Sequence, residues 1–100
     1  MSAVALPFGT FYETVAASQT AQVLGVTGAA GDTLMRLIIT VGTSLTGTVS
    51  LLDNATSYAI MAANTPIGVY TIEINAVSVS GAWKITTGAG ATVMAVGNFS

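Results

Sequence analysis

The segment Val69–Ile74, which reads Val-Tyr-Thr-Ile-Glu-Ile, decides the fold class. Every second residue in it is Tyr or Ile, and the residues between are smaller or polar. Successive side chains of a β-strand point to opposite faces, whereas an amphipathic helix repeats every 3.6 residues. The segment therefore predicts a strand with one face toward a core and Glu73 on the face toward solvent.

Similar short apolar segments occur on both sides of this strand, and turn-forming residues separate them. Strands are predicted at 18–24, 33–41, 48–52, 58–63, 83–87 and 92–96, with a short segment at Val77 and Val79. Gly31-Asp32, Asp53-Asn54 and Gly88-Ala89-Gly90 are turn signals between them. Since no stretch has a sustained helical period, the chain is expected to be all-β. The prediction is an antiparallel β-sandwich or jelly roll of about seven to eight strands, formed by residues 17–100.

The segment Thr33–Val41 is the most apolar of these strands, and Arg36 interrupts it. Its near-continuous apolarity predicts burial on both faces. Asp32 is a poor partner for Arg36, because four residues of strand separate them by about 13 Å. Two interpretations stay open for Arg36. Either a cross-strand or intersubunit group pairs with it, or its side chain extends to solvent.

Residues 1–16 lack a clear period and are predicted to form an extended N-terminal arm. Pro7 disfavours a central strand, since it lacks a backbone N–H. The residues expected to dock the arm on a partner are Leu6, Pro7, Phe8, Phe11 and Tyr12. The alternative is that this segment forms an edge strand of the same sheet.

The composition predicts a protein that self-associates. Hydrophobic residues make up 52% of the chain and charged residues only 6%, against about 25% charged in a typical soluble domain. Small domains often gain stability from disulfides, metals or oligomerisation. The chain has no cysteine and no histidine, so disulfides and the commonest transition-metal sites are excluded. A homo-oligomer is therefore expected.

The residue chemistry argues against catalysis and against nucleic acid. A serine nucleophile lacks its usual base without histidine, and the four acidic residues are each explained by a turn, the arm or a polar strand face. Phosphate backbones attract clustered Lys and Arg, but the net charge is −2 and Arg36 and Lys84 are the only basic residues. No enzyme activity, metal or cofactor is expected.

Trp83 is the only tryptophan. A lone tryptophan in a β-module usually anchors a core or an interface, and stacking on a sugar ring is the other interpretation. The first residues contain no signal-peptide pattern and no apolar run is long enough to span a bilayer. We therefore expect synthesis in a cytoplasm and no membrane partner.

Strand and turn patterns follow one another in the segments Ala30–Ile39, Thr48–Asp53, Ser80–Gly90 and Val93–Phe99. In this layout the chain resembles small β-rich structural proteins of tailed bacteriophages. The resemblance spans roughly residues 17–99 and rests on strand-and-turn patterns, so it transfers no functional residue.

What the resemblance implies is a virion component on the outer capsid surface, made in the host cytoplasm. A capsid decoration (cement) protein fits best, bound to the major capsid protein, with a trimer favoured. One alternative is a receptor- or carbohydrate-binding module of a head or tail fibre. Another is a component of a tail tube or connector ring.

Overall fold

The computed structural model describes residues 11–43 and 47–100, and within these ranges the chain is all-β with no helix. The eight strands are β1 (Phe11–Val15), β2 (Gln22–Val23), β3 (Thr33–Val41), β4 (Val49–Asp53), β5 (Thr56–Met61), β6 (Gly68–Val77), β7 (Trp83–Thr86) and β8 (Ala91–Asn98). All of the observed pairings are antiparallel. The predicted all-β fold is confirmed, and the predicted strand at 33–41 has the observed bounds.

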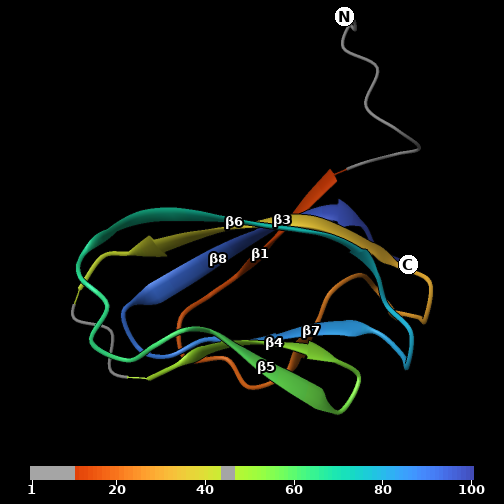
Figure 1. Ribbon diagram of the computed structural model, residues 1–100, viewed down its shortest axis with the longest axis horizontal. Helices are drawn as coiled ribbons and strands as arrows, with labels where there is room; N and C mark the ends of the chain where they lie inside the picture. Colours follow the sequence, from red (N-terminus) through yellow and green to blue (C-terminus); the bar gives the residue numbers. More distant parts are fainter. Residues whose placement is uncertain (1–10, 44–46) are drawn as a thin grey trace, which may run out of the picture.

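The strands form two stacked sheets, with β1-β8-β3-β6 in sheet A and β2-β7-β4-β5 in sheet B. Figure 1 shows the two layers edge-on, with sheet A above sheet B. Only β4 and β5 are consecutive strands paired as a hairpin, and every other connection crosses from one sheet to the other.

The pairings show a jelly roll. The first strand pairs with the last, the second with the seventh, the third with the sixth and the fourth with the fifth. The chain is thus one long hairpin of four strand pairs, rolled so that β8 also pairs with β3 and β7 with β4. This is the double-sheet, eight-stranded form of the antiparallel sandwich.

The core lies between the sheets and comes from alternate residues of the central strands. Leu37, Ile39, Val93 and Ala95 are completely buried on the inner face of sheet A, and Ile85 on that of sheet B. Removing such side chains from water is the main stabilising contribution to a fold of this size. The expectation that β3 is buried on both faces is wrong. Of its outward residues, Arg36 and Ile38 are only half-buried and Thr40 is exposed, because no layer of the described chain covers the outer face of sheet A.

Residues 11–15 form β1, the edge strand of sheet A, in register with Val93–Gly97 of β8. Val15 is completely buried in the core. For these residues the structure shows the edge strand that the sequence left as an alternative to an arm. Residues 1–10 lie outside the described part of the chain.

Candidate interaction surface

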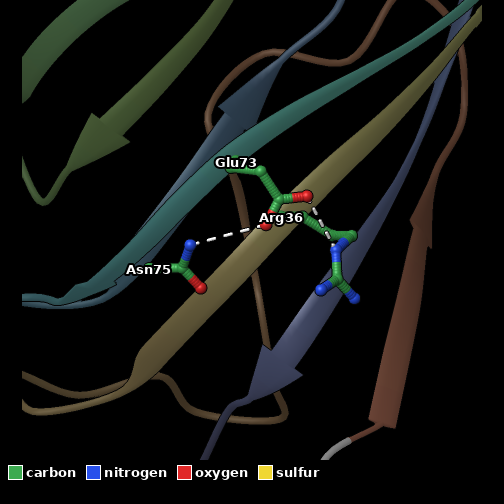
Figure 2. A network of polar contacts seen from close by, with 3 residues as sticks. All are labelled: Arg36, Glu73 and Asn75. Carbon is green, nitrogen blue, oxygen red and sulfur yellow. Dashed lines mark hydrogen bonds and ion pairs between the residues drawn. The ribbon is translucent and has the colours of Figure 1, made fainter.

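The structure places Trp83 and Arg36, the two candidate residues for the core or an interface, in different environments. Trp83 is 5% exposed, and its indole Nε1–H donates a hydrogen bond to the main-chain oxygen of Asp32 at 2.9 Å. It is therefore an anchor of the core. Arg36 lies on the outer face of sheet A, where its Nε donates to Glu73 Oε2 of β6 at 3.0 Å. Figure 2 shows this cross-strand pair with Asn75, whose Nδ2 is 3.4 Å from Glu73 Oε1.

The predicted docking residues of the arm are only partly described. Leu6, Pro7 and Phe8 lie outside the described residues. Phe11 pairs with Gly97 along the backbone, and its side chain is not described. Tyr12 is 66% exposed and lies opposite Val96. Tyr12 therefore presents an aromatic ring at the β1 edge of sheet A.

Each acidic side chain has a structural partner. Glu13 Oε1 accepts a hydrogen bond from the Gly25 N–H at 2.8 Å, and the Asp53 carboxylate accepts from the N–H groups of Val79 and Ser80. Glu73 pairs with Arg36, and the Asp32 carboxylate accepts from the N–H groups of Ala29 and Ser100 and from the Ser100 hydroxyl. Within the described residues no group of three or more acidic side chains is placed to hold a metal ion. All four carboxylates thus accept hydrogen bonds that hold loops or strands in place.

The outer face of sheet A is almost neutral and has no covering layer within the described chain. Cross-strand register brings its outward residues into rows, and one row runs from Tyr12 through Val96 and Arg36 to Glu73. The next row consists of Thr14, Met94, Ile38 and Thr71. The Arg36–Glu73 pair is the only charge in these two rows. Such a surface suits a protein partner better than a charged ligand.

One side of the sandwich is open between its two edge strands, β5 and β6. Glu13 of β1 contacts the chain just after β2, which shows that β1 lies over β2 and that the two sheets stack in the same strand order. Strand β6 therefore lies over β5. Figure 1 shows β6 along the upper layer and β5 along the lower one. We define the open seam as the residues between these strands that remain partly exposed. They are Tyr58 and Ile60 on β5 and Tyr70, Ile72 and Ile74 on β6.

The contrast with the central strands defines the seam. Inward residues of β3 and β8 are completely or almost completely buried, whereas every inward residue of β6 is only half-buried. Tyr58 pairs with Leu51, so both lie on the inner side of sheet B, yet Tyr58 is 54% exposed and Leu51 only 3%. The core therefore extends to solvent along β5 and β6.

The opposite side of the sandwich is closed by hydrogen bonds between β1, β2 and the chain around β7. Thr87 Oγ1 donates to the Ala16 carbonyl at 2.6 Å and accepts from the Gln19 N–H at 2.9 Å. The Ala21 N–H donates to Thr86 Oγ1 at 2.9 Å. These bonds seal the β1–β2 side, so the uncovered apolar surface between the sheets lies on the other side.

Two exposed valines occupy loops at one end of the sandwich. Val26 is 97% exposed and Val79 is 81% exposed. Their loops are joined, since the Gly31 N–H donates to the Ser78 carbonyl at 2.9 Å and the Ser78 hydroxyl donates to the Ala29 carbonyl at 3.0 Å. Because hydrogen bonds already hold these loops in place, binding a partner through the two exposed valines costs little conformational entropy.

The sequence alone predicts the alternation in β6 but not the seam. The clean alternation of Val69–Ile74 reads as a strand that buries one face, and it does not show that this strand lies at an edge. The exposure of Tyr58 likewise follows from the tertiary structure only.

No family model matches this sequence, and neither the curated proteins nor the solved structures contain a match. The described residues contain no helix that is long and apolar enough to cross a membrane. The surface itself is therefore the basis for a functional proposal.

Proposed function

We propose that this chain is a non-enzymatic structural module of a larger assembly, and specifically a decoration (cement) protein on the capsid of a tailed bacteriophage. The observation that supports an assembly role is the open seam, where core-type side chains reach solvent. Soluble monomers rarely leave large contiguous apolar surface uncovered. The seam is continuous with the core, so covering it extends the core across an interface.

The proposed partner is the major capsid protein, and the contacts are many and individually weak. Neutral threonines on the outer face of sheet A, with apolar Ile38 and Met94 among them, suit a contact with another protein. On a repetitive lattice, weak contacts add through multivalency. A stabilising role of this kind requires complementary buried area and no reactive group.

The fold is compatible with this proposal but does not by itself argue for it. Double-sheet jelly rolls are found in viral capsid proteins and in lectins, and one fold serves many functions. The choice of a virion component rests on the resemblance of the strand-and-turn segments to phage structural proteins.

Immunogold electron microscopy tests the location. Antibodies are raised against the purified chain and applied to intact virions from infected cells that produce it. They should label the heads of these virions. Regular labelling over the head surface is the expected result. Labelling confined to the tail or the connector, or no labelling of intact particles, would overturn the decoration role.

The alternative is a receptor- or carbohydrate-binding module of a fibre, and Tyr58 is the observation in its favour. Tyr58 is 54% exposed on an edge strand, and Thr56, two residues before it on the same side of the strand, is also exposed. Aromatic rings so placed can stack on sugars. A glycan array, with Tyr58→Ala as the control, tests this alternative: binding that the substitution abolishes would favour it over the capsid role.

A further inference from the structure

Strand β6 has ten residues, which makes it the longest of the described strands, and it lies at an edge of sheet A. Among the described strands it pairs only with β3. A strand at an edge presents unpaired N–H and C=O groups along one side, and natural proteins usually protect such edges with Lys, Pro, bulges or short length. The sequence of β6 contains no Lys and no Pro, and Glu73 is its only charge.

A distortion interrupts β6 near its end. Its register with β3 shifts between the pairs Arg36–Glu73 and Leu34–Ala76, and Asn75 has a φ of 51°, in the left-handed region. Such a bulge bends a strand and ends regular pairing. The part of β6 that can accept another strand is therefore Gly68–Ile74.

Twofold symmetry fixes how this segment would pair with itself. In an antiparallel pair about a twofold axis, opposite residues must lie on the same face of the sheet. The register that uses all of Gly68–Ile74 places Thr71 opposite Thr71 of the second copy. Val69 then lies opposite Glu73, and Tyr70 opposite Ile72.

This register has no electrostatic conflict. The two Glu73 side chains are separated by four residues along the strands, about 13 Å, and each is already paired with its own Arg36. The other residues of Gly68–Ile74 are uncharged. Like charges directly opposite each other, which would destabilise the pair, are therefore avoided.

The same register covers the open seam. The inward residues Tyr70 and Ile72, which are half-buried in one copy, would pack against Ile72 and Tyr70 of the other. The exposed Tyr58 lies across the seam on β5. Pairing thus continues sheet A across the axis and closes the apolar side of both sandwiches.

We propose that the open seam and the β6 edge form a twofold interface with a second copy of this chain, in the register Thr71 opposite Thr71. This inference goes beyond the decoration role and follows the self-association that the composition predicts, and it assigns a twofold contact in place of the trimer that the resemblance favours. A threefold ring needs two different complementary surfaces, whereas β6 offers one surface that is complementary to itself.

The contact is small, which fixes the expected affinity. Seven residues of strand span about 23 Å and stacked sheets lie about 10 Å apart, so the flat contact is on the order of 250 Å² per copy. Stable dimers bury about 800 Å² per partner. We therefore expect a weak dimer that forms at high micromolar concentrations and that high local concentration on a lattice would populate.

Charge substitutions at Thr71 test the register. Sedimentation equilibrium of the whole chain at high micromolar concentration should give the mass of a dimer. Thr71→Lys and Thr71→Glu should each give monomers, because each places like charges opposite one another on the axis. An equimolar mixture of the two variants should restore the dimer mass. Thermal melts followed by circular dichroism should show that both variants fold like the parent chain.

Thr40→Lys is the matched control, because Thr40 is an exposed threonine on the same outer face but on the central strand β3. It should remain dimeric. A monomer at every concentration, a trimer, or a dimer that Thr40→Lys breaks and Thr71→Lys does not would each overturn the twofold seam interface. None of these results would alter the labelling of virion heads, so failure of the interface is distinguishable from failure of the decoration role.

Discussion

The indole N–H of Trp83 donates a hydrogen bond to the main-chain oxygen of Asp32 at 2.9 Å, and this contact joins the start of β7 in sheet B to the residue before β3 in sheet A. The same Asp32 oxygen accepts a hydrogen bond from the Ser78 N–H at 2.9 Å. Three segments that are distant in sequence therefore meet at one carbonyl group under the buried indole ring. This junction holds the start of β7 in sheet B against the start of β3 in sheet A, at the loop end of the sandwich.

We expect Trp83→Phe to lower the free energy of unfolding by about 1–3 kcal/mol, because it removes a buried hydrogen bond and leaves unfilled volume in the core. Urea denaturation followed by circular dichroism measures the change. Tyr58→Phe is the control, since Tyr58 is exposed, and it should change stability by less than about 0.5 kcal/mol. Equal effects of the two substitutions would contradict the anchor role of Trp83.

The carboxylate of Asp32 is the second part of this junction. Its Oδ2 accepts hydrogen bonds from the N–H groups of Ala29 and Ser100, both at 3.1 Å, and its Oδ1 accepts from the Ser100 hydroxyl at 2.6 Å. Asp32→Asn replaces one acceptor oxygen by a donor NH2 group. We expect the free energy of unfolding to fall by about 2–3 kcal/mol, since these partly buried hydrogen bonds are made to a charged group and such bonds are the stronger ones.

Asp53→Asn is the matched control for that substitution. Asp53 also accepts backbone N–H bonds, from Val79 and Ser80, but these bonds are exposed. Asp53→Asn should therefore lower the free energy of unfolding by a smaller amount, about 1 kcal/mol. Urea denaturation of both variants gives the comparison, and a larger loss for Asp53→Asn would show that Asp32 is not the more important junction.

Gly97 occupies a position that admits no side chain. A Cβ atom there would lie 2.2 Å from the main-chain oxygen of Thr33 and 3.1 Å from the Cα of Leu34. Backbone atoms cannot move aside cheaply, so Gly97→Ala should cost about 3 kcal/mol or more. Gly42→Ala is the control, because a Cβ there meets no atom within 4 Å. Equal melting temperatures of the two variants would contradict the close approach of Gly97 on β8 to the backbone of β3.

The Arg36–Glu73 pair should contribute little to stability. The two side chains are 36% and 53% exposed, and exposed ion pairs are worth about 0–1 kcal/mol. A double-mutant cycle with Arg36→Gln and Glu73→Gln should give a coupling energy within this range. A larger coupling would mean that a partner excludes water from this face.

Truncation separates the two interpretations of the first sixteen residues. Removal of residues 2–16 should lower the free energy of unfolding by at least about 2 kcal/mol, because it deletes β1 and with it the buried Val15. Removal of residues 2–9 leaves β1 in place and should preserve the melting temperature. The shorter truncation is therefore the correct variant for testing whether the first residues dock on a capsid.

Several local features followed from the sequence with their physical reasons. The alternation in Val69–Ile74 placed Glu73 on the outer face, as observed. The Asp53-Asn54 turn signal corresponds to the connection between β4 and β5, where Asn54 has a φ of 57°. These predictions succeed because a strand's face pattern and a turn's backbone conformation depend on neighbouring residues only.

The partner of Arg36 and the exposure of the β3 outer face did not follow. An apolar run such as Thr33–Val41 is the same in a strand covered on both sides and in one that leaves a side open for another molecule. Which of the two holds depends on the layers around the strand. Here the outer face of sheet A has no covering layer within the described chain.

By itself, then, the sequence determined that the chain is all-β and that it carries few charges. It also determined where most strands and turns lie. Only the tertiary structure decided that strand pairs nest from β4–β5 outward to β1–β8 as a jelly roll, and that β5 and β6 are left as the edges of an open seam. The reason is that these pairings join residues far apart along the chain. Their closure depends on which surfaces fit together across the core, and an alternating pattern in one segment carries no information about its neighbour.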